Sequence, residues 1–270
     1  MPERRTLSTT VIDVSWLTPS MVRIVVGGPD LEGFTVGSFT DHYVKCRFGD
    51  KMRSYTVRAW DSKRHLLTLD FLVHGDRGVA GPWAAHAQPG DTLEIMGPGG
   101  GYAPVPEADW HLMVGDDAAL PAIAVSLSRV PAGVPVFAVL EVAGPEHRQP
   151  LSSPGNIDAV WVHRRGDAGR DPEILLDAVR ALSFPAGTGQ AFVHGEADAV
   201  RAIRRHLVLD RGFPTSALSA TGYWKLRRTD EEWRAEKREW IAQADADLVE
   251  APPGPTAAAH GDPPPAAPAT

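Results

Sequence analysis

The chain has 270 residues, of which 43% are hydrophobic and 23% charged, a composition typical of a soluble globular protein with one large or two small domains. Its net charge of −7 argues against a general nucleic-acid binder, which would be basic. The single cysteine, Cys46, excludes an intrachain disulfide and any cysteine-based zinc or iron–sulfur site. The ten histidines show no paired ligand spacing, so we predict no protein-bound metal.

The location of the protein is predicted from what the sequence does not show. No apolar run approaches the length of a membrane span, and the N-terminal residues Met1 to Thr6 lack the apolar core of a signal peptide. We therefore expect a cytoplasmic protein without a membrane span. A separate expectation is that the protein is a monomer.

The first hundred residues or so are rich in β-forming segments separated by turn residues. Six short strands with one small helix before the last predict a closed antiparallel barrel. The strands are expected at Arg5–Trp16, Met21–Gly27, His42–Phe48, Met52–Trp60, His65–His74 and Asp91–Gly97, and the helix at Ala80–Ala87.

From about residue 109, apolar strands alternate with helical stretches, which predicts an open, mostly parallel sheet with helices on its faces. Ligands of such folds bind at the carboxyl ends of the strands. The strands are expected at Trp110–Val114, Val134–Val142, Ala159–His163, Ala191–His194 and Ser216–Ala220, and the helices at Ala118–Ser128, Pro172–Leu182 and Ala197–Leu209.

These patterns divide the chain into a β-barrel domain at 1–105, an α/β nucleotide-binding domain at 106–243 and a disordered tail at 244–270. The second domain ends in a charged helix over Asp230–Gln243, in which Trp233 and Trp240 share one face that we expect to pack onto the body. From Ala251 on, the tail holds seven Pro and seven Ala, a composition that cannot form a core.

The stretch Arg53-Ser54-Tyr55-Thr56 lies in one of the predicted barrel strands. Arg can hold a phosphate with two parallel hydrogen bonds, Tyr can lie against a flat heterocycle, and a Thr hydroxyl can hydrogen-bond a ring nitrogen. These are the contacts that a flavin nucleotide needs. Taken alone, the same four residues also fit an ordinary strand with one exposed Arg.

Further motifs follow at intervals along the chain. The motifs are Asp70-Phe71-Leu72-Val73-His74-Gly75, Gly78-Val79-Ala80-Gly81-Pro82-Trp83, Gly115-Asp116-Asp117-Ala118-Ala119-Leu120-Pro121, Gly195-Glu196-Ala197 and Gly222-Tyr223-Trp224. With residues 53–58, this ordered set resembles the siderophore-interacting proteins, FAD-dependent ferric-siderophore reductases of the ferredoxin-reductase-like superfamily, from about Thr6 to about Trp240.

The resemblance implies that the antiparallel barrel binds FAD, with Arg53 on a phosphate, Tyr55 on the isoalloxazine ring and Thr56 near its N5 atom. The family form Gly-Pro-Ala-Ser is replaced here by Gly78-Val79-Ala80-Gly81, so one side-chain hydroxyl is missing while the backbone amides remain. The other FAD-binding residues that the resemblance implies are Ser54, Asp70, Leu72, Val73, His74, Gly78, Val79, Ala80, Gly81 and Trp83.

The resemblance also implies that NAD(P)H, a transient electron donor, binds at Gly115, Asp116, Asp117, Gly195 and Glu196. The family form Gly-Asp-Glu-Thr-Ala-Leu-Pro has its Thr replaced here by Ala118. Two acids at a helix start would repel a phosphate, which fits a loosely bound donor. The alternative is that the two aspartates only cap the helix.

Five basic residues are candidates for binding a bulky anionic ferric siderophore. Together they would give a basic mouth that raises the local concentration of anions. The alternative for each residue is ordinary solvated charge. The five are Lys45, Arg47, Arg58, Lys225 and Arg227.

The implied reaction carries electrons from NAD(P)H through FAD to siderophore-bound Fe(III), which releases Fe(II) for iron assimilation. The cofactor performs the redox chemistry, so no catalytic side-chain acid or base is expected. Two alternatives stay open: a flavin reductase that serves a protein acceptor, and a non-catalytic protein that binds FAD or siderophore.

Overall fold

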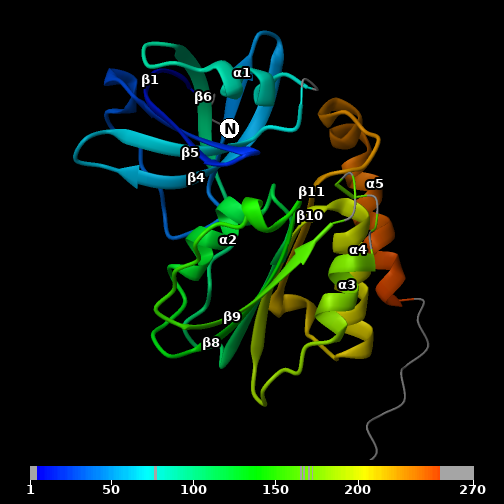
Figure 1. Ribbon diagram of the computed structural model, residues 1–270. Helices are drawn as coiled ribbons and strands as arrows, with labels where there is room; N and C mark the ends of the chain where they lie inside the picture. Colours follow the sequence, from blue (N-terminus) through cyan, green and yellow to red (C-terminus); the bar gives the residue numbers. More distant parts are fainter. Residues whose placement is uncertain are drawn as a thin grey trace, which may run out of the picture.

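The computed structural model describes residues 5–249 except 76, 77, 165, 167, 170 and 172. It confirms the predicted fold class, because a closed six-stranded antiparallel barrel is followed by a five-stranded sheet with helices on both faces (Figure 1). All five strands of the second sheet run parallel. The predicted boundary at 105/106 falls in the connection between the two sheets.

The barrel closes in the order β1-β2-β5-β4-β3-β6. Alternate residues of each strand point inward, so Val22, Ile24 and Val26 of one strand are fully buried, and Cys46 is a buried apolar residue of the same core. The elements are β1 (Thr6–Thr18), β2 (Met21–Gly27), β3 (Tyr43–Phe48), β4 (Lys51–Asp61), β5 (Leu66–Leu72), α1 (Ala80–His86) and β6 (Thr92–Gly99).

The parallel sheet has the order β11-β10-β7-β8-β9. Leu112 and Val114 of its central strand pack with α3 and α4 on one face, whereas Met113 packs with α2 on the other. The elements are β7 (Trp110–Gly115), α2 (Leu120–Leu127), β8 (Pro135–Val142), β9 (Asn156–His163), α3 (Glu173–Arg180), β10 (Gly189–Glu196), α4 (Ala197–Arg205) and β11 (Leu218–Trp224).

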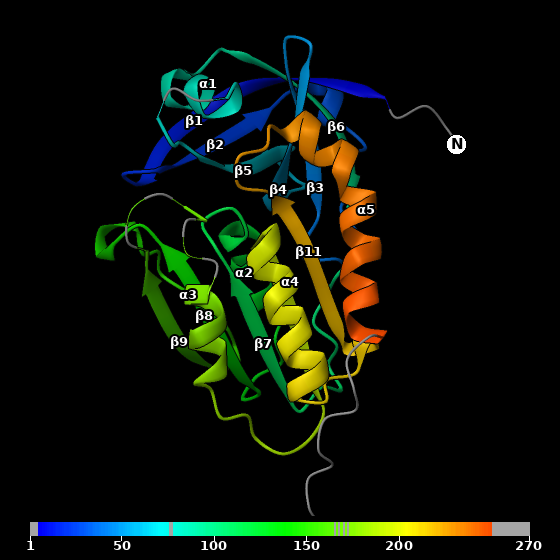
Figure 2. The same cartoon turned by 90° about the vertical axis from the view of Figure 1, so that its right-hand side faces the viewer.

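Helix α5 (Asp230–Val249) runs beside β11 and α4 and reaches the barrel at its N-terminal end (Figure 2). Trp233 and Trp240 are 2% and 5% exposed, and their rings meet edge to face with centroids 5.6 Å apart. The prediction that both rings pack onto the body is therefore confirmed.

The predicted start of the tail at 244 is wrong, because α5 continues to Val249. Ala244 is buried, and Arg201 of α4 donates to both carboxylate oxygens of Asp247, so packing and charge hold the last turns in place. The rest of the predicted tail, 250–270, lies outside the described residues. In the part of the chain that the structure describes, no helix is both long and apolar enough to cross a bilayer.

Several other predicted elements have different bounds. The strand predicted to end at Ala220 continues through Gly222 and Tyr223, because β11 keeps its parallel pairing with β10 as far as Trp224. The helix predicted from Ala118 begins at Leu120, and the helix predicted to reach Leu209 changes at His206 into a π-helical turn. Pro172, the predicted start of another helix, lies outside the described residues.

The two domains meet where α2 lies against β4. Next to this contact, the Thr40 hydroxyl of the barrel side lies 2.8 Å from the Ser126 hydroxyl of α2, and the Thr40 amide donates to the Tyr102 carbonyl at 2.7 Å. The parallel-sheet domain therefore touches the barrel at the strand that carries Arg53 to Thr56.

His194 is a buried titratable residue of β10. It is 4% exposed, its ring stacks on Phe192 with centroids 3.7 Å apart, and its Nε2 atom lies 2.9 Å from the Ser219 hydroxyl. Burial, and next the positive charge of Lys237, lower its pKa from 6.5 to about 3. The folded protein therefore keeps this ring neutral through mildly acidic pH.

This pKa shift gives a stability prediction. Below pH 6.5 His194 binds a proton in the unfolded chain but stays neutral in the folded chain. The free energy of unfolding therefore decreases as the pH falls toward 3. Between pH 7.5 and 5, we expect His194 to account for a loss of about 2 kcal/mol. His194→Gln keeps a hydrogen-bonding partner for Ser219 but cannot titrate. Urea unfolding at the two pH values should show that this variant loses about 2 kcal/mol less than the native chain; equal losses would contradict a neutral His194.

Candidate functional site

The side chains of the predicted flavin motif on strand β4 point to both faces of the strand. Arg53 and Tyr55 stand opposite the core residues Cys46 and Val44 of β3, whereas Thr56 stands on the other face, opposite Tyr43. The Tyr55 ring rests against Phe71 with centroids 4.1 Å apart, which fixes its orientation. Ser54 is exposed, and Thr56 is buried.

Arg53 links the barrel to the C-terminal helix. Its Nη1 donates to Glu231 Oε1 at 2.7 Å and its Nη2 to Glu231 Oε2 at 3.3 Å, with Asp230 Oδ2 3.4 Å from Nη1. Arg234 of α5 donates to the Met52 carbonyl at 2.6 Å. The guanidinium predicted to hold a phosphate is therefore already held by carboxylates at the start of α5, where a helix dipole also favours negative charge.

The segment from Asp70 to His74 forms the end of β5 and the turn after it. The Asp70 side chain is 2% exposed, and its carboxylate accepts two hydrogen bonds from Arg23, at 2.7 and 2.8 Å. It therefore links the neighbouring barrel strands β5 and β2. The Val73 amide donates to the Ser20 carbonyl at 2.8 Å. Leu72 is half-buried and His74 is exposed.

Helix α1 begins at Ala80, two residues after Gly78, as predicted. Its N-cap residue, Val79, makes no side-chain capping bond, so the side chain at this position satisfies none of the backbone N–H groups of the first turn. A Cβ on Gly81 would meet the Leu72 carbonyl oxygen at 3.2 Å, which explains why glycine suits this close approach to β5. Trp83 packs between Phe48 and Phe71, with centroids 5.4 and 5.6 Å away.

The carboxylate of Asp116 holds together the carboxyl ends of three strands. Its Oδ1 accepts from the amides of Ala118 at 2.9 Å and Ala119 at 3.3 Å, and its Oδ2 accepts from the Glu196 amide at 2.9 Å and from Trp224 Nε1 at 2.7 Å. Burial raises its pKa to about 6 despite these four donors. Asp116 therefore binds the amides of the loop just before α2, and its role in dinucleotide binding stays a prediction.

Two predicted glycines make that arrangement possible. A Cβ on Gly115 would stand 2.5 Å from the Ala119 Cβ and 2.7 Å from the His194 carbonyl oxygen. Gly195 has φ near +140°, and a Cβ there would stand 2.8 Å from the Asp116 carboxylate. Glu196 in turn caps α4 by accepting from the amides of Asp198 and Ala199, at 2.7 and 3.0 Å.

Asp117 belongs to a second charged group on the same edge. Its Oδ2 lies 2.6 Å from Nη1 of Arg164, the residue after β9, and the same Nη1 lies 3.8 Å from Glu141 Oε1 of β8. Burial raises the pKa of Glu141 to about 7. Sequence reasoning missed Arg164 and the Glu141 carboxylate, although a charged residue directly after an apolar strand of a parallel sheet is a signal for this edge.

The five predicted substrate residues do not gather as free cations. Arg47 pairs with Glu94 at 2.9 Å, Arg58 lies 3.8 Å from Asp70, and Lys225 lies 3.5 Å from Asp198. Lys45 is half-buried on β3, and Arg227 is exposed with φ of +62°.

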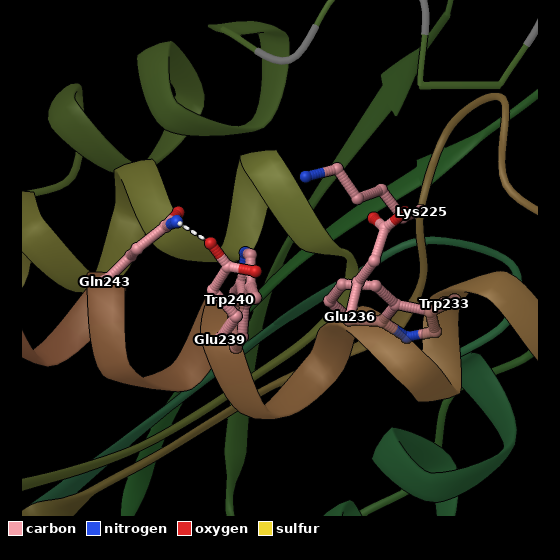
Figure 3. A pocket seen from close by; sticks show the side chains of 6 residues that line it. All are labelled: Lys225, Trp233, Glu236, Glu239, Trp240 and Gln243. Atoms are coloured by element: carbon pink, nitrogen blue, oxygen red, sulfur yellow. Dashed lines mark hydrogen bonds between the residues drawn. The ribbon is translucent and has the colours of Figure 1, made fainter.

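Lys225 also lines a hollow along α5 (Figure 3). This hollow encloses about 270 Å³, and its other lining residues are Trp233, Glu236, Glu239, Trp240 and Gln243. The Lys225 side chain extends along the hollow toward α4 (Figure 3). The role of the five cations in substrate binding stays a prediction.

An antiparallel barrel followed by a five-stranded parallel sheet is a fold that this chain shares with the ferredoxin reductase of carbazole 1,9a-dioxygenase. The family model of siderophore-interacting proteins matches residues 108–227, and that of the siderophore-interacting FAD-binding domain matches residues 49–102. The chain belongs to the siderophore-interacting protein family, whose N-terminal domain binds FAD.

Among curated relatives, ferric vibriobactin reductase ViuB of Vibrio cholerae is 30% identical over 82% of this chain and 90% of its own length. The NADPH-dependent ferric-chelate reductase of Escherichia coli is 27% identical over 81% of this chain and 92% of its own length. Among solved structures, a siderophore utilization protein from T. fusca is 35% identical, with a TM-score of 0.74, and the match covers 84% of this chain and 97% of the other.

Proposed function

We propose that this chain is an NAD(P)H-dependent ferric-siderophore reductase that uses FAD. The observation that carries the proposal is the contact between α2 and β4, because the helix that follows the Gly115–Ala119 loop lies against the strand with the flavin motif. The two matching families and the two reductase relatives support the same reaction class.

The residues present fit FAD. The N-cap residue of α1, Val79, makes no side-chain capping bond, and the Arg53 guanidinium belongs to the same barrel, with 18% of its side chain exposed. We assign Arg53 to a phosphate, Tyr55 to the isoalloxazine ring and Thr56 to its N5 edge. A bound FAD would supply the redox chemistry, which takes a hydride from NAD(P)H and delivers its two electrons singly to Fe(III).

The chain's own groups bind and orient rather than donate protons. The fixed Tyr55 ring would set the plane of the flavin, and the loop after β7 would receive the donor at the carboxyl edge of the parallel sheet. Reduction weakens the grip of hard oxygen ligands on iron, so Fe(II) is released without destruction of the siderophore. The single thiol, Cys46, is buried in the barrel core and takes no part.

The test is an anaerobic visible spectrum of the FAD-loaded protein, followed by NADH or NADPH and then by a ferric siderophore. We expect the flavin band to bleach with the nicotinamide and to return with the siderophore, while a chelator traps Fe(II). A bleached band that only a ferredoxin or an oxygenase restores would favour a reductase with a protein acceptor. A band that neither nicotinamide bleaches would favour the non-catalytic binder.

A further inference from the structure

Carboxylates crowd the edge where NAD(P)H is proposed to bind. Asp116 and Asp117 follow β7, and Glu141 is the last residue but one of the neighbouring β8. The side chains of Asp117 and Glu141 are only 5% and 7% exposed, so water screens them poorly. An uncompensated pair of buried carboxylates here would repel the phosphates of a dinucleotide.

Arg164 is the cation placed against both of these carboxylates. Its backbone amide donates to the Val142 carbonyl at 3.1 Å, which continues the β8–β9 pairing by one residue and fixes the start of the side chain. Nη1 then reaches Asp117 Oδ2 at 2.6 Å and lies 3.8 Å from Glu141 Oε1. The Arg164 side chain is 12% exposed. Because little water surrounds it, its attraction to the neighbouring carboxylates is weakly screened.

The contact between Arg164 and Asp117 leaves bonding capacity unused. Among the described residues, neither Arg164 Nη1 nor Asp117 Oδ2 has a hydrogen-bond partner of acceptable angle, although both atoms are buried. The pair is therefore held by charge rather than by a well-aligned hydrogen bond. Buried polar atoms of this kind normally gain a partner from water or from a ligand.

We propose that Arg164 is a positioning residue for the dinucleotide: it offsets the charges of Asp117 and Glu141 and holds Asp117 so that the Gly115–Ala119 loop can accept an anionic pyrophosphate. This inference rests on the proposed function. The sequence led us to expect that two acids at the start of α2 weaken donor binding. Asp116 instead accepts hydrogen bonds from the loop, and the charge of Asp117 is offset by Arg164.

The test compares three variants by isothermal titration of the FAD-loaded protein with NADP⁺ and with NAD⁺. Arg164→Gln should raise the dissociation constant of the nucleotide that the native protein binds by about 10- to 100-fold. Arg164→Lys keeps the charge and should recover part of that loss. Arg180→Gln is the matched control, because it removes an Arg from exposed ion pairs on α3 and should leave binding unchanged.

The pH dependence separates this role from a merely structural one. The charged groups around Glu141 are Asp116, Arg164, Asp117 and Asp171, and the carboxyl ionises near neutrality. Without Arg164, binding should weaken as the pH rises from 6 to 8.5, because a newly ionised Glu141 is no longer offset. The native protein should show a flatter profile.

Two results would overturn the proposal. One is an Arg164→Gln protein that binds the nucleotide as tightly as the native chain at all pH values. The other is an Arg164→Lys protein that binds no better than the Gln variant while both melt at the native temperature. If the native FAD-loaded protein binds neither nucleotide, the proposed function itself fails, and this result is distinct because it precedes any substitution.

Discussion

Arg53→Ala is expected to raise the dissociation constant for FAD by about 10- to 100-fold. A hydrogen-bonded pair between a guanidinium and a phosphate contributes about 1.5–3 kcal/mol, and alanine leaves the phosphate without that partner. The measurement is quenching of flavin fluorescence when apoprotein is titrated with FAD.

Glu231→Gln is the matched control for this prediction. Arg53 contacts Glu231 and Asp230 of α5, so alanine at 53 also breaks a link between the barrel and the C-terminal helix. The Gln variant weakens that link and keeps the guanidinium, so it should retain FAD. Equal loss of FAD in both variants would show that Arg53 acts through α5, and unchanged FAD binding in Arg53→Ala would show that the phosphate assignment is wrong.

Asp116→Asn is expected to lower the free energy of unfolding by about 3 kcal/mol and Tm by about 6–12 °C. The native carboxylate accepts four N–H groups, two on each oxygen. Asparagine replaces one acceptor oxygen by an NH₂ group, which would face two other donors in a buried site. Urea unfolding and a thermal melt measure the loss.

The matched control for Asp116 is Asp198→Asn on the same edge. Asp198 is half-exposed and lies 3.5 Å from Lys225, so its removal should change stability by less than about 1 kcal/mol. A native-like Asp116→Asn protein would contradict the view that this carboxylate holds β7, β10 and β11 together. The nucleotide dissociation constant, measured on the folded fraction, should rise with the loss of order in the Gly115–Ala119 loop.

For Asp116 and Arg53, the sequence predicts the position on the chain's elements but not the partners of the side chain. The positions of both residues on their elements were predicted, because alternation in strands and the strand-to-helix change are local patterns. Their partners were not predicted. The four donors to Asp116 come from the loop before α2, from β10 and from β11. The carboxylates on Arg53 are 177 and 178 residues away along the chain. Which side chains meet over such separations depends on the packing of the two domains.

The same distinction explains the corrected helix end and the missed arginine. The tail was predicted to begin at residue 244, yet α5 continues because Arg201 and Arg204 of α4 hold Asp247 and Asp245. Arg164 stood in the sequence as one charged residue after a strand. Its proximity to Asp117 and Glu141 exists only because three parallel strands end at one edge.

By itself, the sequence determined the barrel, the parallel sheet, the buried faces and the ordered motifs of the siderophore-interacting family, because these follow from hydrophobic periodicity, turn residues and spacing along the chain. Only the tertiary structure decided which charges are already paired, as in Arg53 with Glu231, Arg58 with Asp70 and Arg164 with Asp117. Pairing depends on distance and burial in three dimensions, and neither is written in the local pattern of residues.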